Sequence, residues 1–299
     1  ELFKGNPAGV VANADGLTDE QMQFIARELN NSETAFLLSP DADNHDVRVR
    51  YFTPTTEVPI CGHATISAHY IRAIEGDPGN AFVRHKTKAG IQNIEYIKSA
   101  NDYRIVMTQE PPVLDKILEE VDTAYLLSAL GLYEADLRED CPVQIVSTGH
   151  SKVLVGIKSR EKLNSLKPNL EQLVRLSEKI GCNGYFIFTL DSGEPDILSY
   201  GRMFAPAIGI NEDPVTGNAN GPLGAYLVAN GLVNHDNEEY NFKGKQGTAM
   251  NRGGIVDVSV KIINGQPVQV KIAGNAVVVY KTEIQLWFSI WAPLIFLRL

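Results

Sequence analysis

Two glycine-containing turns, each followed by an apolar segment, carry side chains that could take part in chemistry. Cys61-Gly62-His63 opens the first segment and Thr216-Gly217-Asn218 opens the second. A helix that begins at such a turn exposes backbone N–H groups and the positive end of its dipole, which favours a carboxylate or another anion. Imidazole titrates near neutral pH, so His63 could hold a substrate carboxylate or transfer a proton. Otherwise the glycines only permit tight turns, and His63 is a hydrogen-bonded core residue.

Two carboxylates stand at places where the two halves of the chain differ. Glu33 begins the strand-like run 33–38, and Asp213 lies before the second turn, whereas the corresponding stretches 182–185 and 58–60 contain no acid. One such acid from each half, converging on a cleft, could act as base and partner acid. Proton transfer at carbon needs a base whose pKa is raised by burial toward the working pH. The alternative is that Asp213 caps a turn and Glu33 is a surface residue of a strand.

The spacing of cysteine and histidine residues gives less support to thiol-based or metal-based chemistry. Cys61 could be a nucleophile or a thiol base activated by the helix end. A two-thiol racemase needs a second cysteine at the mirrored turn, and residues 213–220 contain none. His63 and His69 fall on different helix faces, and no H-E-x-x-H or C-x-x-C spacing occurs, so no metal is expected. No G-x-G-x-x-G or Walker pattern predicts a nucleotide cofactor.

An internal repeat must position these residues. The pattern R-x-F-x-P occurs at residues 50–54 and again at 202–206, in each case at the end of a strand-like run. Upstream, residues 5–11 are loosely matched by 149–155. Two segments that recur in the same order at nearly the same offset predict a duplicated unit.

Each copy is expected to contain a helix, several strands and a second helix. In the first copy, Thr18 and Gln21 form a capping box before a helix, and strands are predicted over 33–38, 81–85, 93–97 and 103–108. The helices after His63 and Asn218 lack a polar face, which is typical of a helix surrounded by protein. The sequence therefore predicts an α/β (α+β) fold with two pseudo-symmetric lobes, each a barrel-like sheet around a central helix.

Domain boundaries follow from prolines and from the repeat. Glu110-Pro111-Pro112 cannot continue a strand or helix. We expect an N-terminal lobe over 1–112 with 275–286 returning to it, and a C-terminal lobe over 113–274. Residues 287–299 form an apolar tail of uncertain origin, too short to span a bilayer, which needs about 20 apolar residues.

Composition and charge argue against a nucleic-acid-binding, a disulfide-rich or a membrane-associated protein. The 299 residues carry a net charge of −9, with Lys and Arg scattered along the chain, so a non-specific nucleic-acid binder is not expected. Three widely spaced cysteines do not make a disulfide framework, which favours a cytoplasmic protein. No signal peptide and no membrane association are expected.

Four motifs in order resemble the phenazine-biosynthesis PhzF family of isomerases, and especially its bacterial YddE-type members. They are F-x-G-N-P-A from Phe3, N-S-E-T-A-F from Asn31, R-Y-F-T-P-x-x-E-V-P-I-C-G-H-A-T from Arg50 and E-D-P-V-T-G-N-A-N-G from Glu212. The resemblance extends to about Leu286 and implies the diaminopimelate-epimerase-like fold, which agrees with the repeat. The family strand that precedes G-N-P is largely missing here, which predicts unpaired backbone groups beside residues 7–11.

The resemblance also implies roles for single residues. Glu33 matches the acid/base glutamate of the S-E-T motif, and His63 and Asp213 match residues that line the substrate site. Gly62 and Gly217 match its backbone contacts, and the substrate-binding set further includes Gln246, from a late Q-G motif, and Asn218. The phenazine enzyme has a serine where Asn218 stands, which leaves the substrate open.

Together these patterns predict an isomerase or epimerase without metal or cofactor, in which a single Glu33 moves a proton between carbons of a small carboxylate-bearing molecule. His63 and Asp213 assist, and a homodimer is left open. Two alternatives remain: a non-catalytic ligand- or protein-binding member of the same fold, and a thiol-based racemase or epimerase.

Overall fold

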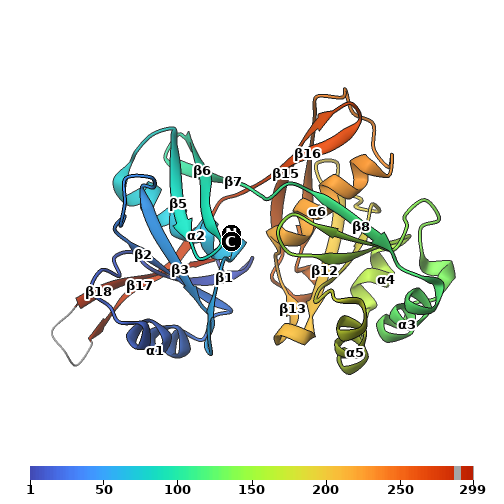
Figure 1. Ribbon diagram of the computed structural model, residues 1–299, viewed down its shortest axis with the longest axis horizontal. Helices are drawn as coiled ribbons and strands as arrows, with labels where there is room; N and C mark the ends of the chain where they lie inside the picture. The colour runs from blue at the N-terminus through green and yellow to red at the C-terminus, as the bar shows by residue number, and fades with distance from the viewer. Residues whose placement is uncertain (286–290, 299) are drawn as a thin grey trace. The chain divides into compact units, whose positions relative to one another are not determined.

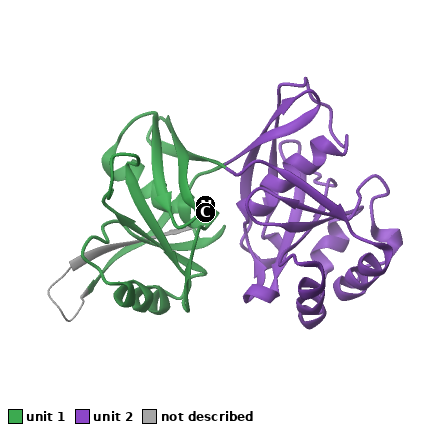
Figure 2. Cartoon of the chain, viewed as in Figure 1, with its two compact units in different colours: residues 1–108, 273–299 green, residues 109–272 purple. Residues whose placement is uncertain are grey.

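The computed structural model describes residues 1–285 and 291–298. The chain divides into two compact units (Figures 1 and 2). Unit 1 comprises Glu1–Thr108 and Ala273–Leu299, and unit 2 comprises Gln109–Ile272. Among the described residues, no helix combines the length and apolar character needed to cross a membrane.

Unit 1 consists of strands around one long helix, with a second helix on the outside (Figure 1). Its elements are β1 (Pro7–Val11), α1 (Asp19–Leu29), β2 (Glu33–Leu38), β3 (Val47–Phe52), β4 (Glu57–Val58), α2 (Gly62–Gly76), β5 (Ala81–Thr87), β6 (Gly90–Ser99), β7 (Asp102–Thr108), β17 (Val277–Gln285) and β18 (Trp291–Arg298).

The elements of unit 2 are β8 (Val113–Ile117), α3 (Glu120–Leu130), η1 (Glu134–Asp136), β9 (Gln144–Ser147), β10 (Lys152–Ile157), α4 (Arg160–Ser165), α5 (Leu170–Ile180), β11 (Tyr185–Thr189), β12 (Ser199–Ala205), η2 (Pro206–Ile208), β13 (Ile210–Asp213), α6 (Gly217–Ala229), β14 (Glu239–Gln246), η3 (Thr248–Met250), β15 (Gly254–Ile263) and β16 (Gln266–Gly274). From β10 onward its strands and α-helices repeat the order of unit 1, with α4 added before α5, and β8, α3, η1 and β9 precede β10.

Strand pairing confirms the duplication. In unit 1, β1 is parallel to β2, β2 is antiparallel to β3, and β3 is parallel to β5. Unit 2 has the same three pairings: β10 is parallel to β11, β11 is antiparallel to β12, and β12 is parallel to β14. The registers agree as well, because Thr34 faces Phe52 and Tyr185 faces Phe204. The expectation of two pseudo-symmetric α/β units is therefore confirmed.

The central helix of each unit is buried, as its lack of a polar face predicted. In unit 1, α2 packs against β1, β2 and β7; in unit 2, α6 packs against β9, β10, β14 and β15. A Cβ on Gly224 would come within 2.9 Å of the side chains of Val258 and Val260, so a glycine is needed for α6 to approach β15 this closely. Helix α1 covers the outside of unit 1 and begins with the predicted Thr18–Gln21 capping box.

The prediction of unpaired backbone groups beside residues 7–11 is wrong. Strand β18 pairs antiparallel with both β1 and β17, as β9 pairs with β10 and β8 in unit 2. Backbone groups of β1 are satisfied by a segment far along the chain, which a motif search near Pro7 does not detect. Of the predicted apolar tail, residues 287–290 and 299 lie outside the described residues.

Candidate active site

Three elements of unit 1 bring the predicted acid and imidazole together. Glu33 is the first residue of β2, and in the register of the parallel pair it lies beside Ala8 of β1. Cys61 is the N-cap of α2 in an extended conformation, and His63 lies in the first turn of that helix. Because α2 packs against both β1 and β2, the start of the helix and the start of the strand lie side by side.

The His63 ring is at the centre of this cluster and is 7% exposed. Its Nε2 lies 3.3 Å from Oε2 of Glu33 and 3.2 Å from Oγ of Ser32. Its Nδ1 lies 3.2 Å from Nδ2 of Asn6 and 3.4 Å from Sγ of Cys61. The Glu33 side chain is only 12% exposed. The structure thus brings together Glu33 and His63, which are far apart in the sequence.

The contacts assign a tautomer to His63. Since the Asn6 amide nitrogen is a donor, Nδ1 accepts from it and Nε2 carries the proton; this assignment follows from the hydrogen-bond network. The protonated Nε2 then lies 3.2 Å from the Ser32 hydroxyl oxygen and 3.3 Å from Oε2 of Glu33, and Oε2 is buried without a hydrogen bond among the described residues. A buried carboxylate next to one imidazole N–H, with an oxygen left for a reactant, is suited to accept and return a proton.

In unit 2, the equivalent turn is held by Asp213, Thr216 and Gln246. The Thr216 hydroxyl donates to the Asp213 carboxylate. The Gln246 amide nitrogen donates to the Asp213 carbonyl at 2.7 Å, and its oxygen accepts from Thr216 N–H and from Nδ2 of Asn220, both at 3.1 Å. Gln246 is fully buried, with both ends of its amide engaged. It therefore fixes the shape of the turn that carries Asp213.

Gln109, which the sequence did not single out, contacts two of the predicted site residues. Its Nε2 donates to Oδ1 of Asn218 at 2.7 Å and to the Gly217 carbonyl at 3.3 Å, and its Oε1 accepts from the Thr148 hydroxyl. The Asn218 side chain is thus held at the start of α6. Gln109 follows β7 and has no motif around it, so only the three-dimensional structure reveals this contact.

An arginine–glutamate pair supports each turn. Arg50 binds Glu57 through two hydrogen bonds of 2.8 Å, and Arg202 binds Glu212 through bonds of 2.8 and 2.7 Å. Each guanidinium also lies about 5 Å from the centre of a phenylalanine ring, namely Phe52 and Phe204. The R-x-F pattern of the repeat is therefore a repeated structural device.

This pairing corrects one sequence comparison. The equivalent of Glu212 is Glu57, so the first copy does have an acid before its turn. In the strand registers Val58 faces Tyr51 and Asp213 faces Met203, which makes Val58 the equivalent of Asp213. The comparison was shifted because η2 adds three residues to the loop of unit 2. Asp213 remains the acid without a counterpart.

Lys152 is a second residue that the sequence did not single out. In the registers it is the equivalent of Ala8, and Gly184 is the equivalent of Glu33. A Cβ on Gly184 would lie 2.3 Å from Cδ of Lys152, so the lysine stem covers the position where unit 1 has its acid. Burial lowers the pKa of Lys152, and its Nζ donates to the Ser151 carbonyl at 3.1 Å.

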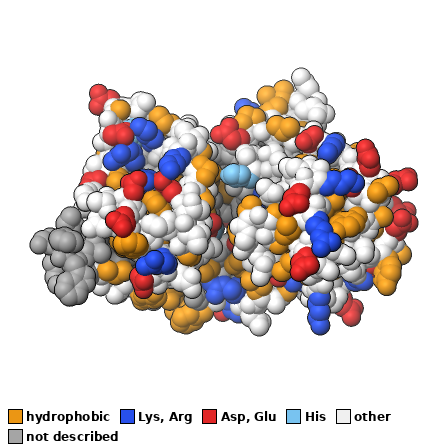
Figure 3. Space-filling view, turned by 60° about the horizontal axis from the view of Figure 1, so that its bottom comes forward, with side chains coloured by type: hydrophobic (Ala, Val, Ile, Leu, Met, Phe, Trp, Pro, Cys, Tyr) orange, Lys and Arg blue, Asp and Glu red, His pale blue; other side chains and the backbone are white. Residues whose placement is uncertain are grey.

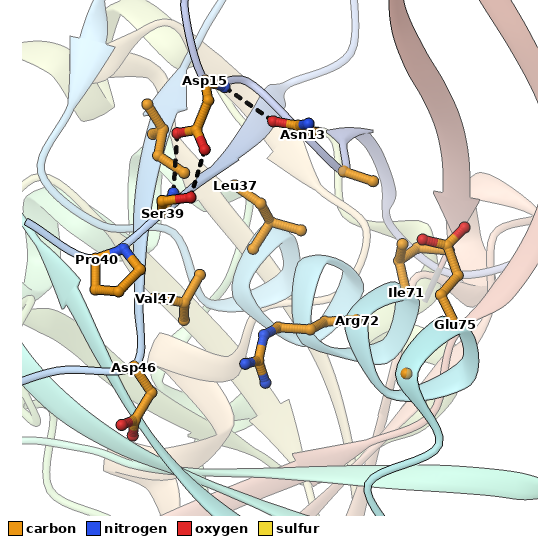
Figure 4. Close-up of a pocket in the computed structure, with 13 residues that line it drawn as sticks. Asn13, Asp15, Leu37, Ser39, Pro40, Asp46, Val47, Ile71, Arg72 and Glu75 are labelled. Carbon is orange, nitrogen blue, oxygen red and sulfur yellow. Dashed lines mark hydrogen bonds between the residues drawn. The ribbon is translucent and has the colours of Figure 1, made fainter.

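A separate hollow of about 510 Å³ lies in unit 1 and contains none of the predicted site residues (Figure 4). Arg72, Glu75 and Asp46 line it, as do Asp15 and Ser39, and Ser39 N–H donates a hydrogen bond to the Asp15 carboxylate. The Ser39 hydroxyl and N–H lower the pKa of Asp15. On the face of the molecule in Figure 3, basic and acidic side chains are interspersed, as the scattered charges of the sequence predicted.

Comparison with known proteins gives matches over nearly the whole chain. The family model described as "Phenazine biosynthesis-like protein" matches residues 1–282. An uncharacterized isomerase of Clostridium acetobutylicum is 57% identical over 286 residues, which are 96% of this chain and 95% of that protein. The uncharacterized isomerase YddE of Escherichia coli K12 is 48% identical over 281 residues, or 94% and 93% of the two chains.

A solved structure agrees with the fold. The crystal structure of a phenazine biosynthesis protein of the PhzF family from Bacillus anthracis matches with a TM-score of 0.84 and 33% sequence identity. The match covers 95% of each chain, so it includes both units.

Proposed function

Because this chain belongs to the phenazine biosynthesis-like PhzF family, as its motifs indicated, and has the two-lobed diaminopimelate-epimerase-like fold, we propose that it moves a proton between carbons of a small carboxylate-bearing molecule. The relatives named above carry the name isomerase, and the proposal adds a mechanism to that class. The observation that supports it is the buried Glu33 carboxylate, 3.3 Å from Nε2 of His63.

Glu33 is proposed as the single acid/base. Its carboxylate takes a proton from one substrate carbon, so that a C–H bond breaks and an O–H bond forms. The same O–H then gives the proton to a second carbon while the electron pair moves between the two carbons. The His63 ring, 3.3 Å from the Glu33 carboxylate, would stabilise its charge, and the backbone N–H groups at the start of α2, beside Gly62, suit the carboxylate of the substrate.

The polar residues of the unit 2 turn are proposed to take part in substrate binding. Asp213 and Asn218 would contact polar groups of the substrate, and Gly217 would offer its backbone at the start of α6. Gln246 and Gln109 are proposed as positioning residues, because their amide groups hold Asp213 and Asn218 in place. Neither resident metal nor cofactor has a part in these steps.

Solvent hydrogen exchange tests the proposal. Small carboxylates are first screened for thermal stabilisation of the chain, since a ligand that binds the folded state raises its stability. Each hit is then incubated with the protein in D₂O. We expect deuterium in the substrate, and we expect Glu33→Gln to lower the rate at least about 100-fold while the thermal shift by the ligand persists. Glu28→Gln, at a glutamate that is 72% exposed on α1, is the matched control and should leave the rate unchanged.

The same experiment separates the alternatives. Saturation with a ligand but no deuterium uptake would favour a non-catalytic binding protein and reject the proposal. Cys61→Ser tests the thiol mechanism, which requires Cys61 as a base. If Cys61→Ser abolished exchange while Glu33→Gln left it intact, the thiol would replace Glu33 in the assignment.

A further inference from the structure

We propose that Glu33, Cys61 and His63 of unit 1 form a binding site for a borderline-soft divalent cation of the zinc class, and that occupancy of this site blocks the acid/base pair. The first part concerns binding alone. The second part rests on the proposed function, because it requires Glu33 to be the proton carrier.

The donor set is the first argument. One thiol sulfur, one imidazole nitrogen and one carboxylate oxygen lie within 4.8 Å of one another, and all three side chains are buried. Zinc is bound in proteins by these three ligand types, and a site with three protein ligands keeps a fourth position for water. A thiolate together with an imidazole favours zinc over the hard cations Mg²⁺ and Ca²⁺, which prefer oxygen ligands. Thiolate and carboxylate also supply two negative charges to balance the ion.

The distances are the second argument. A tetrahedral zinc ion with standard bond lengths separates its nitrogen and oxygen ligands by ~3.4 Å and its sulfur and nitrogen ligands by ~3.6 Å. Here Nε2 of His63 lies 3.3 Å from Oε2 of Glu33, and Sγ of Cys61 lies 4.0 Å from Nε2. The Nε2–Oε2 separation already matches the zinc value, and the Sγ–Nε2 separation exceeds it by about 0.4 Å. All three ligand atoms lie within 4.8 Å of one another.

The surroundings of the ring also fit a metal ligand. A zinc-bound histidine usually donates its other N–H to an oxygen. Asn6 lies 3.2 Å from Nδ1, and an amide rotated by half a turn would present its oxygen there. Glu33 Oε2 is buried without a hydrogen bond among the described residues, so a cation would satisfy an oxygen that only the nearby imidazole now faces.

The second copy of the fold serves as an internal comparison. At the positions of Cys61 and His63, unit 2 has Thr216 and Asn218, and Gly184 takes the position of Glu33. None of these supplies a thiolate, an imidazole or a carboxylate. The same backbone frame therefore predicts one cation per chain, bound in unit 1.

Cobalt spectroscopy and zinc dialysis test the binding. The full chain, without a polyhistidine tag, is stripped with a chelator and titrated with Co²⁺, whose thiolate complexes have a charge-transfer absorption. We expect that absorption at one equivalent, and one bound Zn²⁺ per chain by equilibrium dialysis. Cys61→Ser should abolish the absorption and weaken Zn²⁺ binding by more than about 10-fold. Cys141→Ala, at a buried cysteine of unit 2, is the matched control and should change neither. Thermal unfolding without metal confirms that each variant is folded.

Two results would overturn the site: Co²⁺ that binds without the thiolate absorption, or Zn²⁺ that binds Cys61→Ser as tightly as the unsubstituted chain. The consequence for catalysis is tested separately. One equivalent of Zn²⁺ should suppress deuterium uptake, and a chelator should restore it. If the chain bound zinc but exchanged no deuterium even when stripped, the proposed function would fail and the site would stand. If Glu33→Gln abolished exchange but zinc did not bind, the opposite would hold.

Discussion

Replacing Arg202 by methionine should strongly destabilise unit 2, and more than the same change at Arg50 destabilises unit 1. Arg202 is the more enclosed of the two equivalent arginines: its side chain is 9% exposed, against 23% for Arg50. Its guanidinium binds Glu212 and also donates to the carbonyls of Leu163 and Leu166 at 3.1 and 2.9 Å. Methionine keeps most of the apolar stem but removes every one of these donors.

The cost follows from what the change leaves behind. Glu212 is 16% exposed and would keep its charge without its partner, and two carbonyls at the end of α4 would lose a donor. Breaking a buried ion pair by removing one partner costs about 3–5 kcal/mol. At Arg50 the damage is smaller, because Lys88 lies 2.5 Å from Glu57 and remains after the change. The other partner, Asp19, is 81% exposed and returns to water. We expect about 1–2 kcal/mol there.

Urea denaturation of the Arg202→Met and Arg50→Met variants measures how much each substitution lowers the free energy of unfolding. Because two units can unfold in separate transitions, hydrogen exchange of peptides from β12 and β3 assigns each transition to its unit. The expected result is a loss in unit 2 for Arg202→Met that exceeds the loss in unit 1 for Arg50→Met. Equal losses, or a larger loss for Arg50→Met, would refute the view that the carbonyl contacts and the deeper burial make Arg202 the more important residue.

Two further predictions concern buried groups. Burial lowers the pKa of His85 from its ordinary 6.5 to about 4, so the unfolded chain takes up a proton first as the pH falls. The free energy of unfolding should therefore decrease between about pH 6.5 and pH 4, and His85→Gln should reduce that slope in urea titrations; an unchanged slope would contradict it. Gly184→Ala places a Cβ 2.3 Å from Cδ of Lys152 and should cost about 1–3 kcal/mol in thermal unfolding. The cost should shrink in the double variant with Lys152→Ala, and an additive effect would rule out the contact as its cause.

Much of the fold could be predicted because it repeats local patterns. The R-x-F pattern recurs because each copy uses an arginine to hold the loop before its buried helix, so the duplication leaves a trace in single residues. The strand predicted over 93–97 is the middle of β6 (Gly90–Ser99), whose ends lack the alternation of buried and exposed residues. Helix α1 was predictable from the Thr18–Gln21 capping box, which is a purely local signal.

Only those residues of the candidate site that lie in a sequence motif could be predicted. Glu33 and His63 stand in motifs of the family, and the structure places them in contact. Gln109 and Lys152 act through residues far along the chain, such as Asn218 and Gly184, and a single sequence contains no local pattern for such contacts. The grouping of Glu33 with Cys61 and His63 could not be predicted for the same reason, since Glu33 belongs to no short spacing with Cys61.

The duplicated frame bears on the stereochemistry of the proposed reaction. A racemase with two bases removes a proton from one face of a carbon and delivers another from the opposite face, which requires an acid/base group in each copy. Here Glu33 has Gly184 as its equivalent, and the lysine stem closes that position. The Asp213 carboxylate already accepts a hydrogen bond from the Thr216 hydroxyl. A single base must return the proton to the face from which it came. The proposed chemistry is therefore a shift of a proton between two carbons on one face, and part of the original hydrogen should stay in the product because a proton held on a buried carboxyl exchanges slowly with solvent.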